Sequence, residues 1–102
     1  MTYYRLDENH EIHPFTDPRE LEQVLKDPSR IIGSTHLEEY LISTVFLGID
    51  HNFFGSGPPL LFETMIFGPP DDDELYQTRC CTYAEALEMH KRGIKHAKGL
   101  LK

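Results

Sequence analysis

Residues 43–68 read STVFLGIDHNFFGSGPPLLFETMIFG and decide the fold of this 102-residue chain. Two apolar runs flank a loop rich in glycine and proline at residues 51–59, a pattern typical of an antiparallel β-hairpin. In the predicted register, Asp50 lies opposite Leu60 and Leu47 lies opposite Glu63. Both faces of this hairpin are then apolar, with Leu41, Val45, Leu47, Ile49, Leu61, Met65 and Phe67 on one face and Tyr40, Ile42, Phe46, Leu60, Phe62 and Ile66 on the other.

Two helices are predicted outside the hairpin. In TDPRELEQVLKDP, Asp17 is a helix cap, Glu20 completes a capping box and Pro28 ends the helix. The second helix starts in TYAE, with Thr82 and Glu85 as its capping box, and continues towards residue 102. Strands are predicted at Arg30–Thr35, Tyr40–Asp50, Leu60–Phe67 and Leu75–Cys81, with a fifth at Thr2–Leu6.

These elements predict a single α+β domain over residues 1–102, with a small antiparallel sheet of four to five strands and two helices. An antiparallel sheet with two apolar faces needs a cover on each, and two helices supply only one layer. We therefore expect the second face to contact another subunit, which makes the protein a homo-oligomer.

The charge distribution restricts the kinds of partner that the protein can bind. The formal net charge is −7, which argues against general nucleic-acid binding because phosphate neutralisation needs a basic surface. All 17 acidic side chains lie in residues 1–90, whereas residues 91–102 hold five basic side chains and no acidic one. A small anionic ligand near the carboxyl end is therefore compatible with the sequence.

The chain contains no apolar stretch long enough for a membrane helix or a signal peptide, so we expect a cytoplasmic protein that does not bind membranes. Cys80 and Cys81 are adjacent and fit neither an ordinary disulfide nor a spaced metal-ligand motif.

The candidate ligand-binding residues come from the long loop and from the second helix. Phe53 and Phe54 offer aromatic faces beside the hydrogen-bonding groups of His51 and Asn52, a combination suited to a base. On the second helix, Lys91 and Lys95 belong to a basic stripe that would offset phosphate charge if the helix reaches the loop.

Three further residues have both a structural and a functional interpretation. Glu63 lies on an apolar face and needs a donor, which is either Arg79, a lysine, a backbone amide or the ligand. Asp50 either caps the turn after its strand or contacts ligand. His90 lies on the apolar stripe of the second helix and is either a buried, hydrogen-bonded histidine or a ligand or base.

The sequence predicts neither a catalytic residue nor an intrinsic metal or cofactor. No nucleophile motif or phosphate-binding glycine loop is present. Asp50, His51, Glu63 and His90 match no metal-ligand spacing, and His10 with His13 would clamp a metal only if HEIH were helical.

Three segments carry a family resemblance: STVFLGIDH at residues 43–51, LLFETMIF at 60–67 and TYAEALEMH at 82–90. With these, the chain resembles a widespread family of short phage and prophage proteins of uncharacterised function, over roughly residues 1–96. The resemblance implies a phage accessory protein in the bacterial host cytoplasm. By analogy with small phage proteins that sequester cyclic nucleotide defence signals, it implies an anti-defence role.

Three function classes are therefore left open. The first is a non-enzymatic homo-oligomer that binds a small anionic ligand such as a cyclic dinucleotide. The second is a protein-interaction factor for virion assembly or host takeover. The third is a metal-assisted hydrolase.

Overall fold

The computed structural model describes residues 1–53, 55–70 and 76–101. Its largest element is a four-stranded antiparallel sheet in the order β3-β4-β5-β6, so strands that follow one another in the chain are neighbours in the sheet. The strands are β3 (Ile31–Leu37), β4 (Tyr40–Phe46), β5 (Phe62–Phe67) and β6 (Tyr76–Cys80). The α+β fold with antiparallel strands and two helices is confirmed.

A separate two-stranded sheet precedes the main one. It pairs β1 (Tyr3–Leu6) with β2 (Ile12–Phe15), and the Tyr4 amide donates to the Gly48 carbonyl at 2.9 Å. The first strand therefore lies beside the end of β4 and does not extend the four-stranded ladder. β2 was not predicted from the sequence. It contains Pro14, which is tolerated in a short edge strand such as this one.

The predicted hairpin register is shifted by two residues from the observed one. Val45, not Leu47, lies opposite Glu63, and the ladder between β4 and β5 ends at the pair Phe46 and Phe62. β4 stops early because Gly48, with φ of +77°, turns the chain out of the strand. A two-residue shift keeps the alternation of side chains, so both apolar faces of the hairpin are preserved.

Both helices start where the sequence predicts. In α1 (Pro18–Lys26), Asp17 accepts a hydrogen bond from the Arg19 amide, and within the described residues the Glu20 side chain makes no return bond, so the predicted capping box is reduced to Asp17 alone. A short 3₁₀ turn, η1 (Pro28–Arg30), follows α1. In α2 (Tyr83–Leu100), the Thr82 hydroxyl accepts from the Glu85 amide at 3.1 Å.

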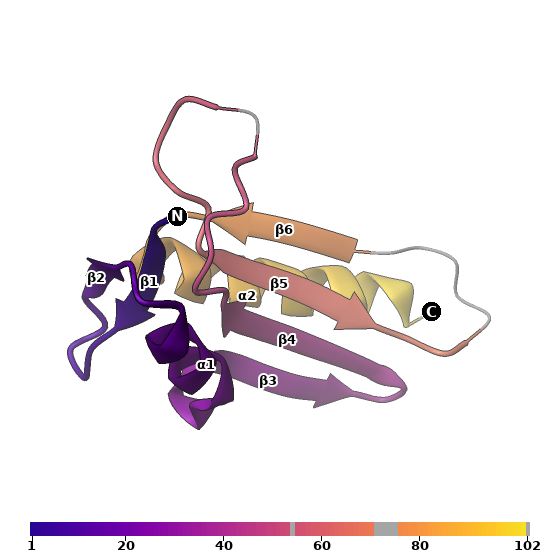
Figure 1. Cartoon of the computed structure of the whole chain (residues 1–102). Coiled ribbons are helices and arrows are strands. Elements are labelled where there is room, and N and C mark those ends of the chain that lie inside the picture. The colour runs from indigo at the N-terminus through magenta and orange to yellow at the C-terminus, as the bar shows by residue number, and fades with distance from the viewer. Residues whose placement is uncertain (54, 71–75, 102) are drawn as a thin grey trace.

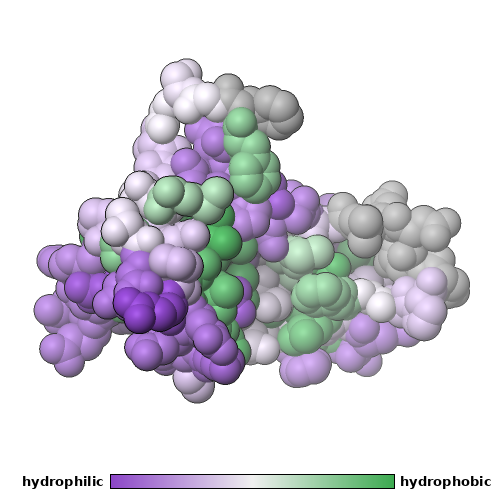
Figure 2. Space-filling model, viewed as in Figure 1, coloured by the Kyte–Doolittle hydropathy of each residue, from purple (hydrophilic) through white to green (hydrophobic). Residues whose placement is uncertain are grey.

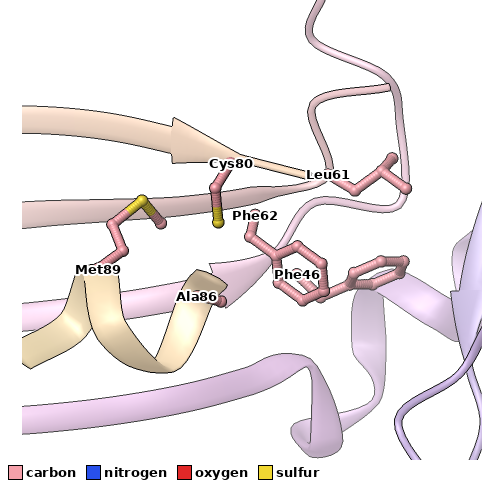
Figure 3. Close-up of a cluster of buried hydrophobic side chains, with 6 residues drawn as sticks. All are labelled: Phe46, Leu61, Phe62, Cys80, Ala86 and Met89. Atoms are coloured by element: carbon pink, nitrogen blue, oxygen red, sulfur yellow. The ribbon is translucent and has the colours of Figure 1, made fainter. Parts of the chain in front are cut away.

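One face of the four-stranded sheet is covered by α2. The helix runs along the sheet and contacts all four strands, whereas α1 lies with the small sheet near one end (Figure 1). Ala86 and Met89 of α2 point towards the side chains of the strand ends (Figure 3). This part of the core consists of Phe46, Leu61, Phe62, Cys80, Ala86 and Met89, and a second cluster of Tyr40, Ile42, Ile66 and Ala97 continues it along the helix.

The opposite face of the sheet has no such cover within the described part of the chain. We call it the open face and define it by Ile31, Leu41, Val45, Met65 and Phe67, which lie on one side of the ladder. Ile31 is 54% exposed and Phe67 is 50% exposed. Apolar surface lies over the sheet beside the polar surface around α1 (Figure 2). Neither described helix is long and apolar enough to cross a membrane.

Candidate functional site

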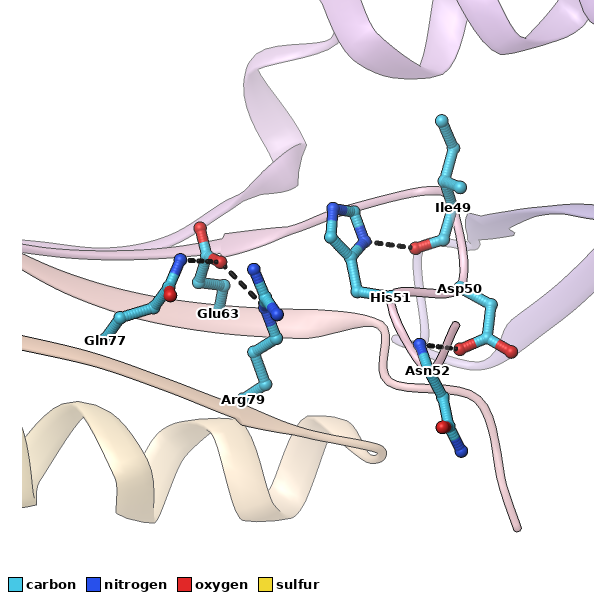
Figure 4. A network of polar contacts seen from close by, with 7 residues as sticks. All are labelled: Ile49, Asp50, His51, Asn52, Glu63, Gln77 and Arg79. Carbon is cyan, nitrogen blue, oxygen red and sulfur yellow. Dashed lines mark hydrogen bonds and ion pairs between the residues drawn. The ribbon is translucent and has the colours of Figure 1, made fainter. Parts of the chain in front are cut away.

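The polar residues at the start of the long loop hold the loop itself together. One carboxylate oxygen of Asp50 accepts from the amides of Asn52 at 2.8 Å and Leu60 at 2.9 Å, which closes the base of the loop. The His51 Nδ1 atom lies 2.8 Å from the Ile49 carbonyl oxygen (Figure 4). Asp50 is therefore a turn cap, the structural alternative in the sequence analysis.

The aromatic residue Phe53 projects from this loop. Its side chain is 70% exposed, and its ring centroid lies 5.4 Å from that of His51. The Asn52 side-chain amide donates to the Ser56 carbonyl oxygen at 3.2 Å. Phe54, the other predicted aromatic contact, lies outside the described residues. His51, Asn52 and Phe53 thus form a small exposed polar and aromatic surface on the loop.

The two predicted lysines lie elsewhere on the molecule. Lys91 is ion-paired with Glu88 of the same helix at 3.2 Å. Lys95 lines a groove beside β6. Within the described residues, His51, Asn52 and Phe53 make no hydrogen bond or ring contact with either lysine. The loop residues are also absent from the lining of the groove that contains Lys95.

Glu63 belongs to a polar cluster on the same side of the sheet as the open face. Its carboxylate accepts from Arg79 Nε at 2.9 Å and from the Gln77 side-chain amide at 2.8 Å (Figure 4). Arg79 is the cross-strand partner of Glu63 in the ladder between β5 and β6. The donor that the sequence requires for Glu63 is therefore Arg79, helped by Gln77.

His90 is half-buried and is held in place by threonine hydroxyls. Its Nε2 atom lies 2.9 Å from Thr35 Oγ1 and its Nδ1 atom 2.7 Å from Thr44 Oγ1, and Thr44 is hydrogen-bonded in turn to buried Thr64. Burial lowers the pKa of His90 below its ordinary value. With both ring nitrogens engaged, His90 links α2 to β3 and β4 and is not presented to a ligand.

The groove beside α2 has the composition of an anion-binding surface. Arg92, Lys95, His96 and Gly99 recur at helical spacing along one side of α2, and Tyr76 of β6 and Leu100 complete the lining. The Tyr76 and His96 rings lie 4.5 Å apart between centroids. Arg92 and Lys95 have no acidic partner among the described residues, so both cations are free to meet an anion.

Two other hollows fit an anionic ligand less well. A cavity between α1 and β1 measures about 220 Å³ and is lined by Glu20 and Asp27 as well as Arg5 and Arg30. A hollow at the end of α2 contains Glu38 and Glu39. The open groove beside α2 has a volume of about 590 Å³ and no acidic residue in its lining among the described residues, and small-molecule sites span roughly 300–1,000 Å³.

The sequence analysis found Lys95 but missed Tyr76, Arg92, His96 and Gly99. The signal was present in the spacing of 92, 95, 96 and 99, which places all four residues on one side of a helix. The contribution of Tyr76 depends on how β6 lies against α2, which no local pattern specifies.

The adjacent cysteines do not form a reactive thiol site. Both are free, and Cys80 is buried in the core. Burial raises the pKa of the Cys80 thiol to about 11 and also raises the pKa of Cys81. The raised pKa values keep both thiols protonated near neutral pH, which disfavours the thiolate that a nucleophile requires.

Comparison of the chain with protein-family models, curated proteins and solved structures gives no match.

Proposed function

We propose that the protein is a non-enzymatic binding protein for a small anionic ligand, and that a nucleotide is the ligand class that suits it best. The observation that supports this proposal is the groove beside α2, where Arg92 and Lys95, two cations with no acidic partner in the described part of the chain, adjoin the aromatic rings of Tyr76 and His96. An aromatic face binds a base by stacking, and nearby cations offset phosphate charge.

The narrower proposal concerns the kind of nucleotide and the setting. The family resemblance of STVFLGIDH and LLFETMIF favours a phage accessory protein that sequesters cyclic nucleotide defence signals in the host cytoplasm. A sequestering protein needs tight binding and no turnover. This is consistent with His90 and Asp50, both of which are engaged in internal hydrogen bonds.

We also propose that the protein pairs with a second copy through its open face. Ile31 and Phe67 are each about half exposed there, and exposed apolar patches of this kind mark contact surfaces. In a two-fold dimer each copy contributes the same surface to the interface, so the open face of one copy would pack against the open face of the other.

Calorimetry with a panel of cyclic and linear nucleotides tests the ligand proposal. We expect one or more of them to bind, and we expect Arg92→Ala combined with Lys95→Ala to weaken binding by at least about a hundredfold, since each charge-assisted contact contributes roughly 1.5–3 kcal/mol. Gly99→Leu should also block binding, because a side chain at residue 99 enters open space in the groove lining.

Matched variants separate the groove from the rest of the surface. Lys98→Ala removes one positive charge from the same helix without altering the groove lining and should leave affinity nearly unchanged. Phe53→Ala tests the loop, and loss of binding in that variant alone would move the site from the groove to residues 51–53. No heat and no thermal shift with any nucleotide would overturn the proposal, and metal-dependent turnover of a nucleotide would favour the hydrolase class.

A further inference from the structure

Three side chains with metal-ligating atoms meet at the turn between β1 and β2. One ligand atom each from Asp7, Glu11 and His13 lies within 4.8 Å of the others. The sequence analysis considered His10 with His13 as a clamp only if the segment were helical. The segment is a hairpin instead, and the His10 ring stacks on Tyr83 with a centroid distance of 4.0 Å.

The convergence of the three side chains follows from the geometry of the hairpin. Glu11 and His13 are two residues apart, so their side chains leave an extended chain on the same side. Asp7 lies across the turn from Glu11, because the Asp7 amide donates to the Glu11 carbonyl at 3.0 Å. Side chains that lie opposite each other across an antiparallel pair also share a face.

The carboxylate of Asp7 is already oriented for a ligand. Its Oδ1 atom accepts from the amides of Asn9 at 2.8 Å and Glu11 at 2.9 Å, which leaves Oδ2 directed at His13 Nε2 at 2.7 Å. Two of the three donors are therefore held at nearly the separation that neighbouring ligands of one ion require.

We infer that Asp7, Glu11 and His13 form a binding site for one divalent transition-metal ion of the zinc class. An imidazole nitrogen with two carboxylates suits zinc, cobalt or nickel, whereas magnesium and calcium prefer oxygen ligands alone. The Asp7 and His13 side chains are 24% and 39% exposed, so an ion can enter from solvent. Glu11 is exposed and can rotate to shorten its distance to the ion.

Binding would replace the Asp7–His13 hydrogen bond by two metal–ligand bonds and close the turn between β1 and β2. Three protein ligands leave the remaining coordination positions to water, as in open zinc sites. Arg5, the cross-strand partner of His13, is a competing positive charge on the same side of the hairpin. Arg5→Gln should therefore strengthen cation binding.

Titration of the metal-free full chain with Zn²⁺ tests this inference, with calorimetry for stoichiometry and imidazole NMR signals for the residue involved. We expect one ion per chain and a selective shift of the His13 signals. His13→Gln and Glu11→Gln should each weaken binding at least tenfold, because even the loss of an outer-shell contact costs about 10–100-fold.

Two control variants test whether side chains outside the proposed site contribute to zinc binding. His36→Gln removes an exposed histidine from β3, and Cys81→Ser removes the more accessible thiol, and neither should change the affinity. Absence of stoichiometric binding would overturn the site, as would equal affinity in the wild type and the Glu11→Gln variant. Because the groove beside α2 shares no residue with this turn, the result does not depend on nucleotide binding.

Discussion

His90 places a polar, hydrogen-bonded side chain against the core. A neutral imidazole can donate from one nitrogen and accept at the other, which matches the two threonine hydroxyls that contact it. A Cβ built on Gly33 would lie 2.9 Å from the imidazole ring of His90, which is too close. The ring can occupy this place only because residue 33 is a glycine. The histidine and the glycine are therefore a packed pair between α2 and β3.

This environment predicts a pH dependence of stability. The pKa of His90 is lowered in the folded state, so between its folded pKa and the ordinary value of 6.5 the unfolded chain binds more protons. The stabilising contribution of neutral His90 is complete above pH 6.5 and is lost as the pH falls through the folded pKa. Urea unfolding between pH 7.5 and 5 should show this decrease.

The control for this measurement is a second histidine. His90→Gln should flatten the dependence, whereas His36→Gln, at an exposed position, should retain it. An unchanged slope in the His90→Gln variant would assign the pH dependence to other groups.

At the scale of the elements, the packing of α2 depends on one of its two glycines. Gly93 is buried, and a Cβ there would lie 3.1 Å from methyl groups of Ile42 and Thr64. A Cβ built on Gly99, by contrast, would have no other atom within 4 Å. The two glycines therefore have opposite structural roles in one helix.

Alanine substitutions should separate these roles. Gly93→Ala should lower the free energy of unfolding, because overpacking costs about 1–3 kcal/mol against a helix-propensity gain of up to about 1 kcal/mol. Gly99→Ala should raise it by a few tenths of a kcal/mol, up to about 1. The measurement is the melting temperature of both variants. Equal changes in melting temperature would mean that Ile42 and Thr64 move to accommodate the methyl group added at residue 93.

Periodicity and capping chemistry made most of the elements predictable. The cap at Thr82 and the apolar, β-branched and aromatic runs at residues 40–46 and 62–67 are local signals, and α2, β4 and β5 follow from them. The exact pairing of Val45 with Glu63 was not predictable, because Gly48 ends β4 earlier than its apolar sequence suggests. The groove was only partly predictable for a related reason, since it depends on the packing of α2 against β6 and not on either element alone.

For the whole molecule, the open face predicts association. We expect a dimer of twice the 11.8 kDa chain mass in light scattering at micromolar concentration. Ile31→Glu combined with Phe67→Glu should yield a monomer with an unchanged circular dichroism spectrum, because both side chains are about half exposed in the single chain. Arg19→Glu, at the exposed start of α1, is the matched control. A monomeric wild-type chain would leave the open face without the proposed partner.

The position of α2 in the chain also has a consequence for biosynthesis. All four strands of the main sheet are translated before residues 83–100, which supply the cover of one apolar face. The nascent sheet therefore has no core to fold around until α2 has left the ribosome. A premature stop codon before residue 83 would release a chain with two unprotected apolar faces, a substrate for chaperones and proteases and no longer a folded protein.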